Sequence, residues 1–438
     1  MPNDSASEDK GDPILWSSGE GLELVFRPDP HVWDGRYANN GWLQELPRPF
    51  TKVTWDNAAL VSPKLADREK LENGDIVQLT FRGRQLNAPI WIQPGQAENS
   101  VTLHLGYGRT AAGRVGNKVG FDAYRLRTVS ALWYGDGLAL RKTGQKHQFA
   151  STQHHHSIEG RRMFRDGTLA EFTKNPRFAL QMTEVPEENE TLYDPQEWSN
   201  SGYAWGMVID LNTCIGCSAC TIACQAENNI PVVGKYQVGV GREMQWIRID
   251  NYYAGSPDNP DFNHQPVPCM HCEHAPCELV CPVGATVHDD EGLNLQVYNR
   301  CVGTRYCSNN CPYKVRRFNF LEYNGDLSAT EKLGKNPDVT VRSRGVMEKC
   351  TYCLQRINAA RYDAELENRP IHDGEVVPAC AQVCPTEAIT FGNIRDPNGR
   401  VAALKRSPLN YGMLSELNTR PRTTYLAKLR NPSAELRT

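Results

Sequence analysis

The sequence predicts an α+β protein in which a β-rich domain precedes a cysteine-rich domain, and three observations lead to this prediction. All fifteen cysteines of the 438-residue chain lie between Cys214 and Cys384. The stretch before them carries short alternating apolar segments between turn signals, as β-strands do. Hydrophobic residues make up 39% of the chain and charged residues 23%, which is typical of globular proteins. We place the β-rich domain at 1–135, a linker at 136–205, the cysteine-rich domain at 206–395 and a basic tail at 396–438.

The β-rich domain has its clearest strand at residues 76–81, where Ile-Val-Gln-Leu-Thr-Phe alternates roughly after the turn signal Asn73-Gly74-Asp75. A second turn at Gly83 leads to a second strand at 88–92, and a short helix is expected earlier, at 65–71. The glycine-rich basic stretch from Gly106 to Gly120 favours a surface loop. Its backbone N–H groups and cations would also suit an anion, so that use stays open.

The linker has two features that favour solvent-exposed or interface roles. The adjacent histidines His154, His155 and His156 cannot easily face one metal ion. A short helix is expected from Thr168 to Lys174. An acidic run near the end of this segment is also typical of linkers. It contains Glu187, Glu188, Glu190 and Asp194.

The charge and the apolar pattern exclude several classes of protein. A net charge of −3 argues against a nucleic-acid partner, which a basic excess would indicate. No run of about eighteen apolar residues occurs, so no transmembrane helix is expected. The first twelve residues are polar and acidic, and we expect no secretory signal there.

Four cysteine groups dominate the second domain. The first is Cys214-x2-Cys217-x2-Cys220-x3-Cys224, the run that binds iron–sulfur clusters in bacterial ferredoxins. Three thiolates of such a run converge from one tight loop, while the fourth, on the following helix, faces a neighbouring cluster. The other three groups share its rhythm. They are Cys269, Cys272, Cys277 and Cys281, then Cys301, Cys307 and Cys311, and finally Cys350, Cys353, Cys380 and Cys384.

Thr304 stands where the third group would have a second cysteine. If partner groups exchange their fourth cysteine, three sites receive four thiolates and one receives three, which uses all fifteen. A hydroxyl is a poor iron ligand beside thiolate. We therefore predict three 4Fe–4S clusters and one 3Fe–4S cluster, although a four-iron cluster with an external ligand stays open at Thr304. Residues 284–297 read as the hairpin that joins the halves of a ferredoxin.

Two other interpretations of the cysteines are weaker. Zinc sites use Cys-x2-Cys pairs in fours, and three-cysteine runs closed by x3-Cys fit them poorly. A complete disulfide framework fails on the odd count.

These groups resemble the four-cluster ferredoxin subunit of the dimethyl-sulfoxide-reductase superfamily, and most of all the B subunit of bacterial alternative complex III. The resemblance covers nearly all of 205–438. It rests on Cys214-Ile-Gly-Cys-Ser-Ala-Cys220, on residues 224–231, on Cys269-Met-His-Cys272, on residues 310–319 and on residues 420–432.

The resemblance implies a ligand set for each cluster. Two 4Fe–4S clusters would use Cys214, Cys217, Cys220 and Cys384, and Cys224, Cys350, Cys353 and Cys380. The third 4Fe–4S cluster would use Cys269, Cys272, Cys277 and Cys311. The 3Fe–4S cluster would use Cys281, Cys301 and Cys307, with Thr304 as a non-ligand.

Residues 42–135 resemble, more weakly, the C-terminal six-stranded barrel of the superfamily's molybdopterin subunit, which is of the double-psi type. In alternative complex III that portion carries no molybdenum. Only its end is present here, so the resemblance implies a split B subunit without molybdenum, completed by a separate polypeptide.

The resemblance also implies the role of an electron-transfer subunit that is not catalytic alone. It would relay electrons from quinol, oxidised in an integral-membrane NrfD-like partner, toward multihaem cytochrome c subunits. It would lie peripherally on the periplasmic face of the cytoplasmic membrane, with the basic tail packed on partners or against clusters. Cations near the cysteine groups would stabilise reduced clusters or merely keep the surface soluble; they are Lys314, Arg316, Arg317, Lys349 and Arg356. Two alternatives stay open: the beta subunit of a molybdenum-containing polysulfide or dimethyl sulfoxide reductase, and a non-redox scaffold with zinc.

Overall fold

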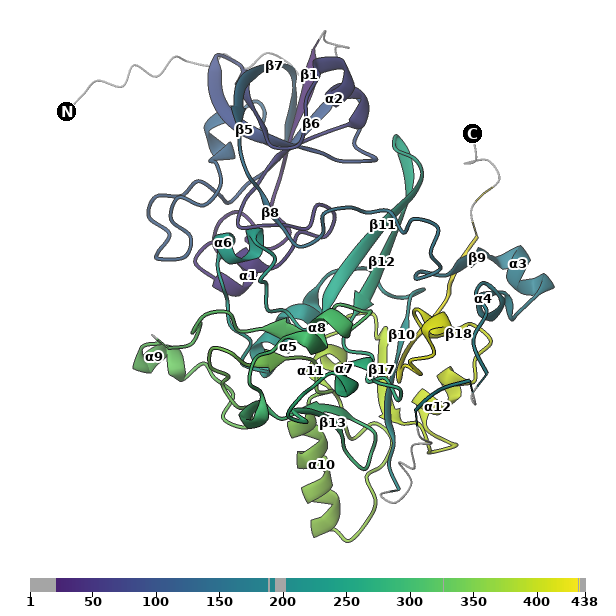
Figure 1. The fold of residues 1–438 in the computed structure, drawn as a ribbon. Helices are drawn as coiled ribbons and strands as arrows, with labels where there is room; N and C mark the ends of the chain where they lie inside the picture. The colour runs from purple at the N-terminus through teal and green to yellow at the C-terminus, as the bar shows by residue number, and fades with distance from the viewer. Residues whose placement is uncertain (1–20, 188–189, 194–201, 326, 432, 434–438) are drawn as a thin grey trace. The chain divides into compact units, whose positions relative to one another are not determined.

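The computed structural model describes residues 21–187, 190–193, 202–325, 327–431 and 433, and it divides the chain into two compact units (Figure 1). Unit 1 comprises residues 1–44, 53–150 and 255–260, and unit 2 comprises 45–52, 151–254 and 261–438. The first twenty residues lie outside the described residues, and they include the segment in which no secretory signal is expected. So do Glu188 and Asp194 of the acidic run and the last residues of the tail.

Unit 1 contains a closed barrel with the strand order β1-β6-β3-β5-β4-β7. The six-stranded barrel expected from the resemblance is therefore present. The central strand β4 alternates between buried and half-buried residues, as its sequence predicts. The strands are β1 (Leu22–Arg27), β3 (Ala59–Val61), β4 (Asp75–Phe81), β5 (Arg84–Ile92), β6 (Ser100–His104) and β7 (Tyr134–Lys146).

The last barrel strand corrects the expected domain boundary at residue 135. β7 runs on to Lys146 because Leu140 and Ala139 pair with β4 opposite Leu79 and Thr80. Its exposed side is polar and contains Arg141, so its sequence lacks the apolar run that would have marked it as a strand.

The expected short helix is present as α2 (Pro63–Glu69), slightly earlier than predicted. The side chain of Ser62 accepts a hydrogen bond from the Leu65 amide at 3.0 Å, and Pro63 occupies the first helical position. Lys70 then ends the helix in a left-handed conformation. The chain also forms α1 (Gly41–Glu45), the paired strands β2 (Val53–Thr54) and β8 (Ala150–Ser151), and η1 (Ala123–Leu126).

Unit 2 is organised around a four-stranded sheet in the order β17-β10-β19-β18. Its strands are β10 (Trp205–Asp210), β17 (Ile389–Asn393), β18 (Asn410–Tyr411) and β19 (Thr423–Leu426). β19 comes from the basic tail, lies parallel to β10 and is buried along its length. Part of the tail therefore completes the chain's own sheet.

The remaining elements of unit 2 are short and surround the cysteines. The expected hairpin is present as β13 (Thr286–His288) and β14 (Asn294–Gln296), and the expected linker helix is α3 (Leu169–Lys174). The helices are α4 (Phe178–Gln181), α5 (Ala219–Glu227), α6 (Lys235–Gly239), α7 (Pro276–Leu279), α8 (Tyr306–Asn310), α9 (Ala329–Lys332), α10 (Leu354–Leu366), α11 (Ala379–Gln382) and α12 (Arg400–Lys405), with η2 (Tyr298–Arg300) and η3 (Ser415–Leu417). The other strands are β9 (Asp166–Thr168), β15 (Arg317–Phe318), β16 (Met347–Glu348) and β20 (Lys428–Arg430), and the hairpin β11 (Arg248–Ser256) and β12 (Asn259–Val267).

The two units have separate hydrophobic cores. The barrel core contains Leu24, Val77 and Leu103 and no cysteine among the described residues that form it. The core of unit 2 includes nine buried cysteines, which are Cys220, Cys224, Cys269, Cys272, Cys277, Cys307, Cys311, Cys350 and Cys380. Cysteines are therefore a large part of this core.

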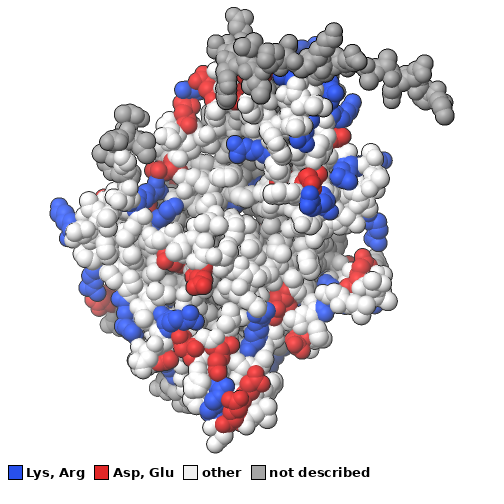
Figure 2. Space-filling model, turned by 180° about the vertical axis from the view of Figure 1, so that it is seen from behind, with Lys and Arg blue, Asp and Glu red and all other residues white. Residues whose placement is uncertain are grey.

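The surface carries charges of both signs. On the face that Figure 2 presents, Lys and Arg side chains are interspersed with Asp and Glu, consistent with the net charge of −3. In the described ranges, no helix has the length and apolarity that a membrane span requires.

Candidate metal centres

The first site is a pocket with four thiols in its wall: Cys214, Cys217, Cys220 and Cys384. Ile249, Pro266 and Ile389 supply apolar lining. Burial, together with the other three thiols, raises the pKa of Cys220 to about 12. Four sulfurs share this confined space, where thiolates would repel one another unless a cation balanced their charge.

The second site gathers Cys224, Cys350, Cys353 and Cys380, which come from distant parts of the sequence. Burial raises the pKa of Cys224 well above its usual range, and the three other thiols add to the rise. The amide of Asn228 points its nitrogen at two of these sulfurs, 3.5 Å from Cys224 Sγ and 3.9 Å from Cys353 Sγ.

The third site gathers Cys269, Cys272, Cys277 and Cys311. Burial raises the pKa of Cys272 well above its usual range, and the other three thiols raise it further. Asn294 also approaches this site, with its side-chain nitrogen 3.8 Å from Cys277 Sγ.

The fourth site has three thiols, from Cys281, Cys301 and Cys307. Burial raises the pKa of Cys307, and the thiols of Cys301 and Cys281 add to the rise. Burial acts in the same sense on Cys281, but the backbone N–H groups of Val283, Ala285 and Thr286 outweigh it and lower that pKa overall. Thr304 is exposed at the surface.

The helices explain how cysteines close in sequence reach different sites. On α5, Cys220 faces the first site and Cys224, one turn later, faces the second. α11 packs on α5, and its cysteines serve the same two sites in the opposite order. Cys380 lies at the second site and Cys384, just after the helix, lies at the first. α7 and α8 form the equivalent pair for the third and fourth sites. Cysteines spaced by x3 thus serve two neighbouring sites. In α5 they lie one helical turn apart, and in the other three pairs the second cysteine follows the end of the helix.

The contacts between sites place them in one order. The thiol of Cys220, from the first site, raises the pKa of Cys380 in the second. The thiol of Cys269, from the third site, acts likewise on Cys350 in the second. The third and fourth sites meet at Arg316, which acts on both Cys277 and Cys307. The thiol sites therefore form a line from first to fourth.

A glycine makes the tight loop of the first site possible. Gly216 has a φ of +67°, and a Cβ there would lie 2.3 Å from the ring of His264. Only glycine combines this left-handed conformation with so close a neighbour.

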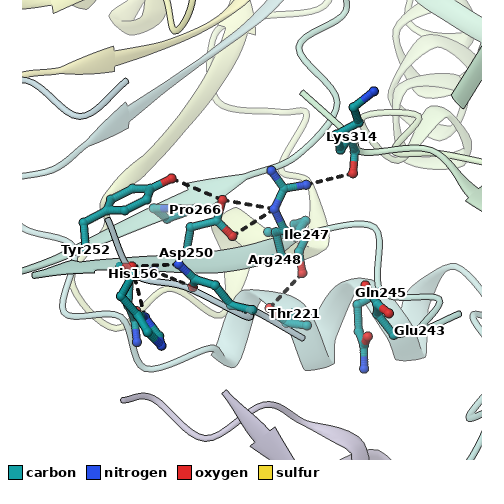
Figure 3. Close-up of polar contacts among 12 residues, drawn as sticks. His156, Thr221, Glu243, Gln245, Ile247, Arg248, Asp250, Tyr252, Pro266 and Lys314 are labelled. Carbon is teal, nitrogen blue, oxygen red and sulfur yellow. Dashed lines mark hydrogen bonds and ion pairs between the residues drawn. The ribbon is translucent and has the colours of Figure 1, made fainter. Parts of the chain in front are cut away.

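Polar contacts at the start of β11 connect two cysteine-bearing segments (Figure 3). The Thr221 hydroxyl on α5 donates to the Ile247 carbonyl at 3.2 Å. The Arg248 guanidinium donates to the Lys314 carbonyl at 2.8 Å and pairs with Asp250 at 2.8 Å. Ile247 and Arg248, at the start of β11, thereby link the helix that carries Cys220 to the loop that follows Cys311.

An aromatic pair lies between the second and third sites. The ring of His271, inside the Cys269–Cys272 loop, stacks on Tyr352, inside the Cys350–Cys353 loop, with centroids 3.8 Å apart. Both side chains are buried. This pair and the two asparagines at sulfur have no recognised motif in the sequence. Their positions relative to the cysteines could have identified them. Asn228 follows Cys224 by one helical turn, and each ring lies inside a Cys-x2-Cys loop.

The cations noted in the sequence divide into two groups. Arg316 contacts cysteine sulfur, and Lys349 is fully buried with its amine donating to the carbonyls of Asn294 and Cys350. Arg317 pairs with Glu243, Arg356 pairs with Glu227, and Lys314 is exposed.

The histidine triplet does not form a metal site in the described part of the chain. His154 and His155 are exposed, and His156 contacts the Asn251 carbonyl and the ring of Tyr253. More generally, no three Cys, His, Asp or Glu side chains among the described residues surround a position for a single metal ion.

Comparison with known proteins matches this chain to iron–sulfur proteins. Two family models, each described as a 4Fe-4S dicluster domain, match residues 213–285 and 261–325. The chain is 41% identical over 231 residues to the iron–sulfur cluster-binding subunit of menaquinone reductase from Nitratidesulfovibrio vulgaris, covering 51% of this chain and 89% of that subunit.

Two further relatives have similar coverage. The Hdr-like menaquinol oxidoreductase iron–sulfur subunit 1 of Archaeoglobus fulgidus is 31% identical over 269 residues, which is 57% of this chain and 93% of the relative. The B subunit of polysulfide reductase from Wolinella succinogenes is 32% identical over 222 residues, which is 50% of this chain and 91% of the relative.

Proposed function

The chain belongs to the family of iron–sulfur subunits of dimethyl-sulfoxide-reductase-type complexes, and on this basis we propose that it is the electron-transfer subunit of a membrane quinol oxidoreductase of the alternative complex III type. Two relatives carry menaquinone or menaquinol in their names, which supports a quinol as the electron source. The subunit relays electrons from quinol, oxidised in an integral-membrane partner, toward multihaem cytochrome c subunits.

The observation that carries this proposal is the line of four thiol sites. Its donor sets fit iron–sulfur clusters, since four, four, four and three cysteine sulfurs converge in largely buried surroundings. Bound clusters would supply one-electron transfer, at potentials set by cluster type, charge, hydrogen bonds to sulfur and exposure. The protein holds the sulfurs in place, donates hydrogen bonds to them and excludes water from the second and third sites.

We further propose the individual ligand sets. Each of the first three sites holds a 4Fe–4S cluster on its four cysteines, and the fourth holds a 3Fe–4S cluster on Cys281, Cys301 and Cys307. Thr304 supports the smaller cluster because its exposed hydroxyl replaces the fourth thiol.

The barrel and the location of the complex belong to the same proposal. The barrel is a molybdopterin-type portion that carries no molybdenum. The assembly lies against the cytoplasmic membrane on its periplasmic face, bound to an NrfD-like membrane subunit.

A metal and haem inventory of the native complex tests the proposal. We expect about fifteen irons per chain, covalently bound haem and no molybdenum. Zinc in place of iron would support a non-redox scaffold and contradict the proposal.

A second candidate function follows from the likeness to the B subunit of polysulfide reductase. In that case the same sites would serve a molybdenum-containing reductase of the polysulfide or dimethyl sulfoxide type. Stoichiometric molybdenum and no haem subunits in the native complex would favour this candidate.

A further inference from the structure

Arg316 is a buried cation that contacts a thiol of the third site and acts electrostatically on a thiol of the fourth. It lies between α8 and β15, and only 6% of the residue is exposed. Its Nη2 donates to Cys277 Sγ of the third site at 3.0 Å. Its positive charge also acts on the thiol of Cys307 in the fourth site, where it opposes the rise in pKa that burial causes.

The β13–β14 hairpin fixes the guanidinium in this position. Nη1 donates to Thr286 Oγ1 at 3.2 Å and to Gln296 Oε1 at 2.9 Å, and Nη2 donates to Asn294 Oδ1 at 3.0 Å. These three acceptors are neutral, so they orient the guanidinium without neutralising its charge.

The charge is balanced mainly by sulfur. Burial acts to lower the pKa of Arg316, but nearby cysteines outweigh this effect and the pKa is raised overall. These cysteines are Cys277, Cys307, Cys269 and Cys311. A buried cation is costly unless an anion compensates it. Anionic clusters on these cysteines would supply the compensation from two sides.

We propose that Arg316 is a positioning residue shared by the third and fourth sites, whose guanidinium raises the reduction potentials of both clusters. The proposal rests on the proposed function, because it presupposes clusters at both sites. Reduction adds an electron to a cluster, so a fixed positive charge and a hydrogen bond to sulfur favour the reduced form. Since the charge of one guanidinium acts on cysteines of both sites, its removal changes both potentials together.

Redox titrations of the purified complex, monitored by EPR, test this inference with two variants. In Arg316→Gln, we expect both potentials to become more negative, with the equilibrium constant for one-electron reduction lowered at least about tenfold at each site. The first and second sites keep their potentials. Arg316→Lys keeps the charge without the planar fork, so we expect smaller shifts at the same two sites.

The neighbouring residue offers a matched control. The Arg317 guanidinium pairs with Glu243 at 2.7 Å and donates to the Gln245 carbonyl at 3.1 Å, so an anion already balances its charge. We expect Arg317→Gln to leave all four potentials unchanged.

The outcomes separate the inference from the proposed function. A shift at only one of the two sites, no shift, or an equal shift in Arg317→Gln overturns the inference. Absence of cluster signals from the wild-type protein overturns the proposed function as well. If Arg316→Gln loses iron, the titration of Arg316→Lys decides, since shifts at both sites support the inference and unchanged potentials overturn it.

Discussion

At the scale of single residues, one hydroxyl distinguishes the fourth site from the other three. Thr304 is exposed, beside Gly303 and Arg305, which both have positive φ. A cysteine at 304 would add the missing thiolate to the three already present. We expect Thr304→Cys to convert the 3Fe–4S cluster to 4Fe–4S, to abolish the three-iron EPR signal of the oxidised protein and to slow its reduction by quinol.

Thr304→Ser provides the control, because it keeps a hydroxyl and should keep the three-iron signal. Iron analysis should find about one more iron per chain in Thr304→Cys than in either other protein. If the oxidised wild-type protein lacks a three-iron signal, the interpretation of Thr304 is wrong.

Single residues also decide how much of the thiol sites can be predicted from the sequence. The spacing of the cysteines predicts groups and an exchange of the fourth cysteine, because x3 spans one helical turn. Spacing does not say which groups exchange, which depends on α5 packing against α11 and α7 against α8. Residues without a motif, such as Asn294, reach sulfur only through the folded hairpin.

At the scale of elements, the sequence predicts those with local signals. The β4 strand and the β13–β14 hairpin follow from alternation and turns, and α2 from an apolar segment that its Ser62 cap fixes. The sequence does not predict β7 and β19, because the strands with which they pair are distant in sequence. β19 needs β10, which lies more than two hundred residues earlier, and only that pairing buries it.

The helix α12 ends in a lysine whose titration affects stability. Burial lowers the pKa of Lys405 to about 7, although its amine donates to the Arg422 carbonyl at 2.8 Å and to Thr424 Oγ1 at 3.1 Å. In the unfolded chain the pKa is about 10.4. Between these values the unfolded chain binds a proton that the folded chain lacks, so stability rises with pH. The free-energy cost of burying the protonated amine of Lys405 lowers the stability in full below about pH 7 and disappears above about pH 10.

We therefore expect Lys405→Met to change stability with opposite signs at the two ends of this range. At pH 6 the variant should gain about 1–2 kcal/mol, because no charge is buried. At pH 10 it should lose about 1 kcal/mol, because two hydrogen bonds are gone. Thermal unfolding at both values measures this, with Lys332→Met, at an exposed position, as the control. An equal change at both pH values would contradict the titration of Lys405.

At the scale of the whole molecule, the distribution of cysteines makes the two units depend differently on iron. Nine cysteines belong to the core of unit 2, whereas the described residues of the barrel core include none. Sulfurs arranged for clusters leave space between them and repel one another when ionised. Metal binding is coupled to folding in such sites, because the ligands alone do not form a compact core.

Removal of iron should therefore unfold one unit and spare the other. After chelation under reducing conditions, we expect amide hydrogen exchange to become fast in α5, α8, α11 and β10 and to stay slow in β4 and β5. The iron-loaded protein, measured in the same buffer, is the reference. Loss of protection in the barrel to the same extent would show that its stability depends on the clusters. Unchanged protection in α5 and α11 would show that buried thiols alone pack well enough to hold unit 2, and would remove the link between folding and iron.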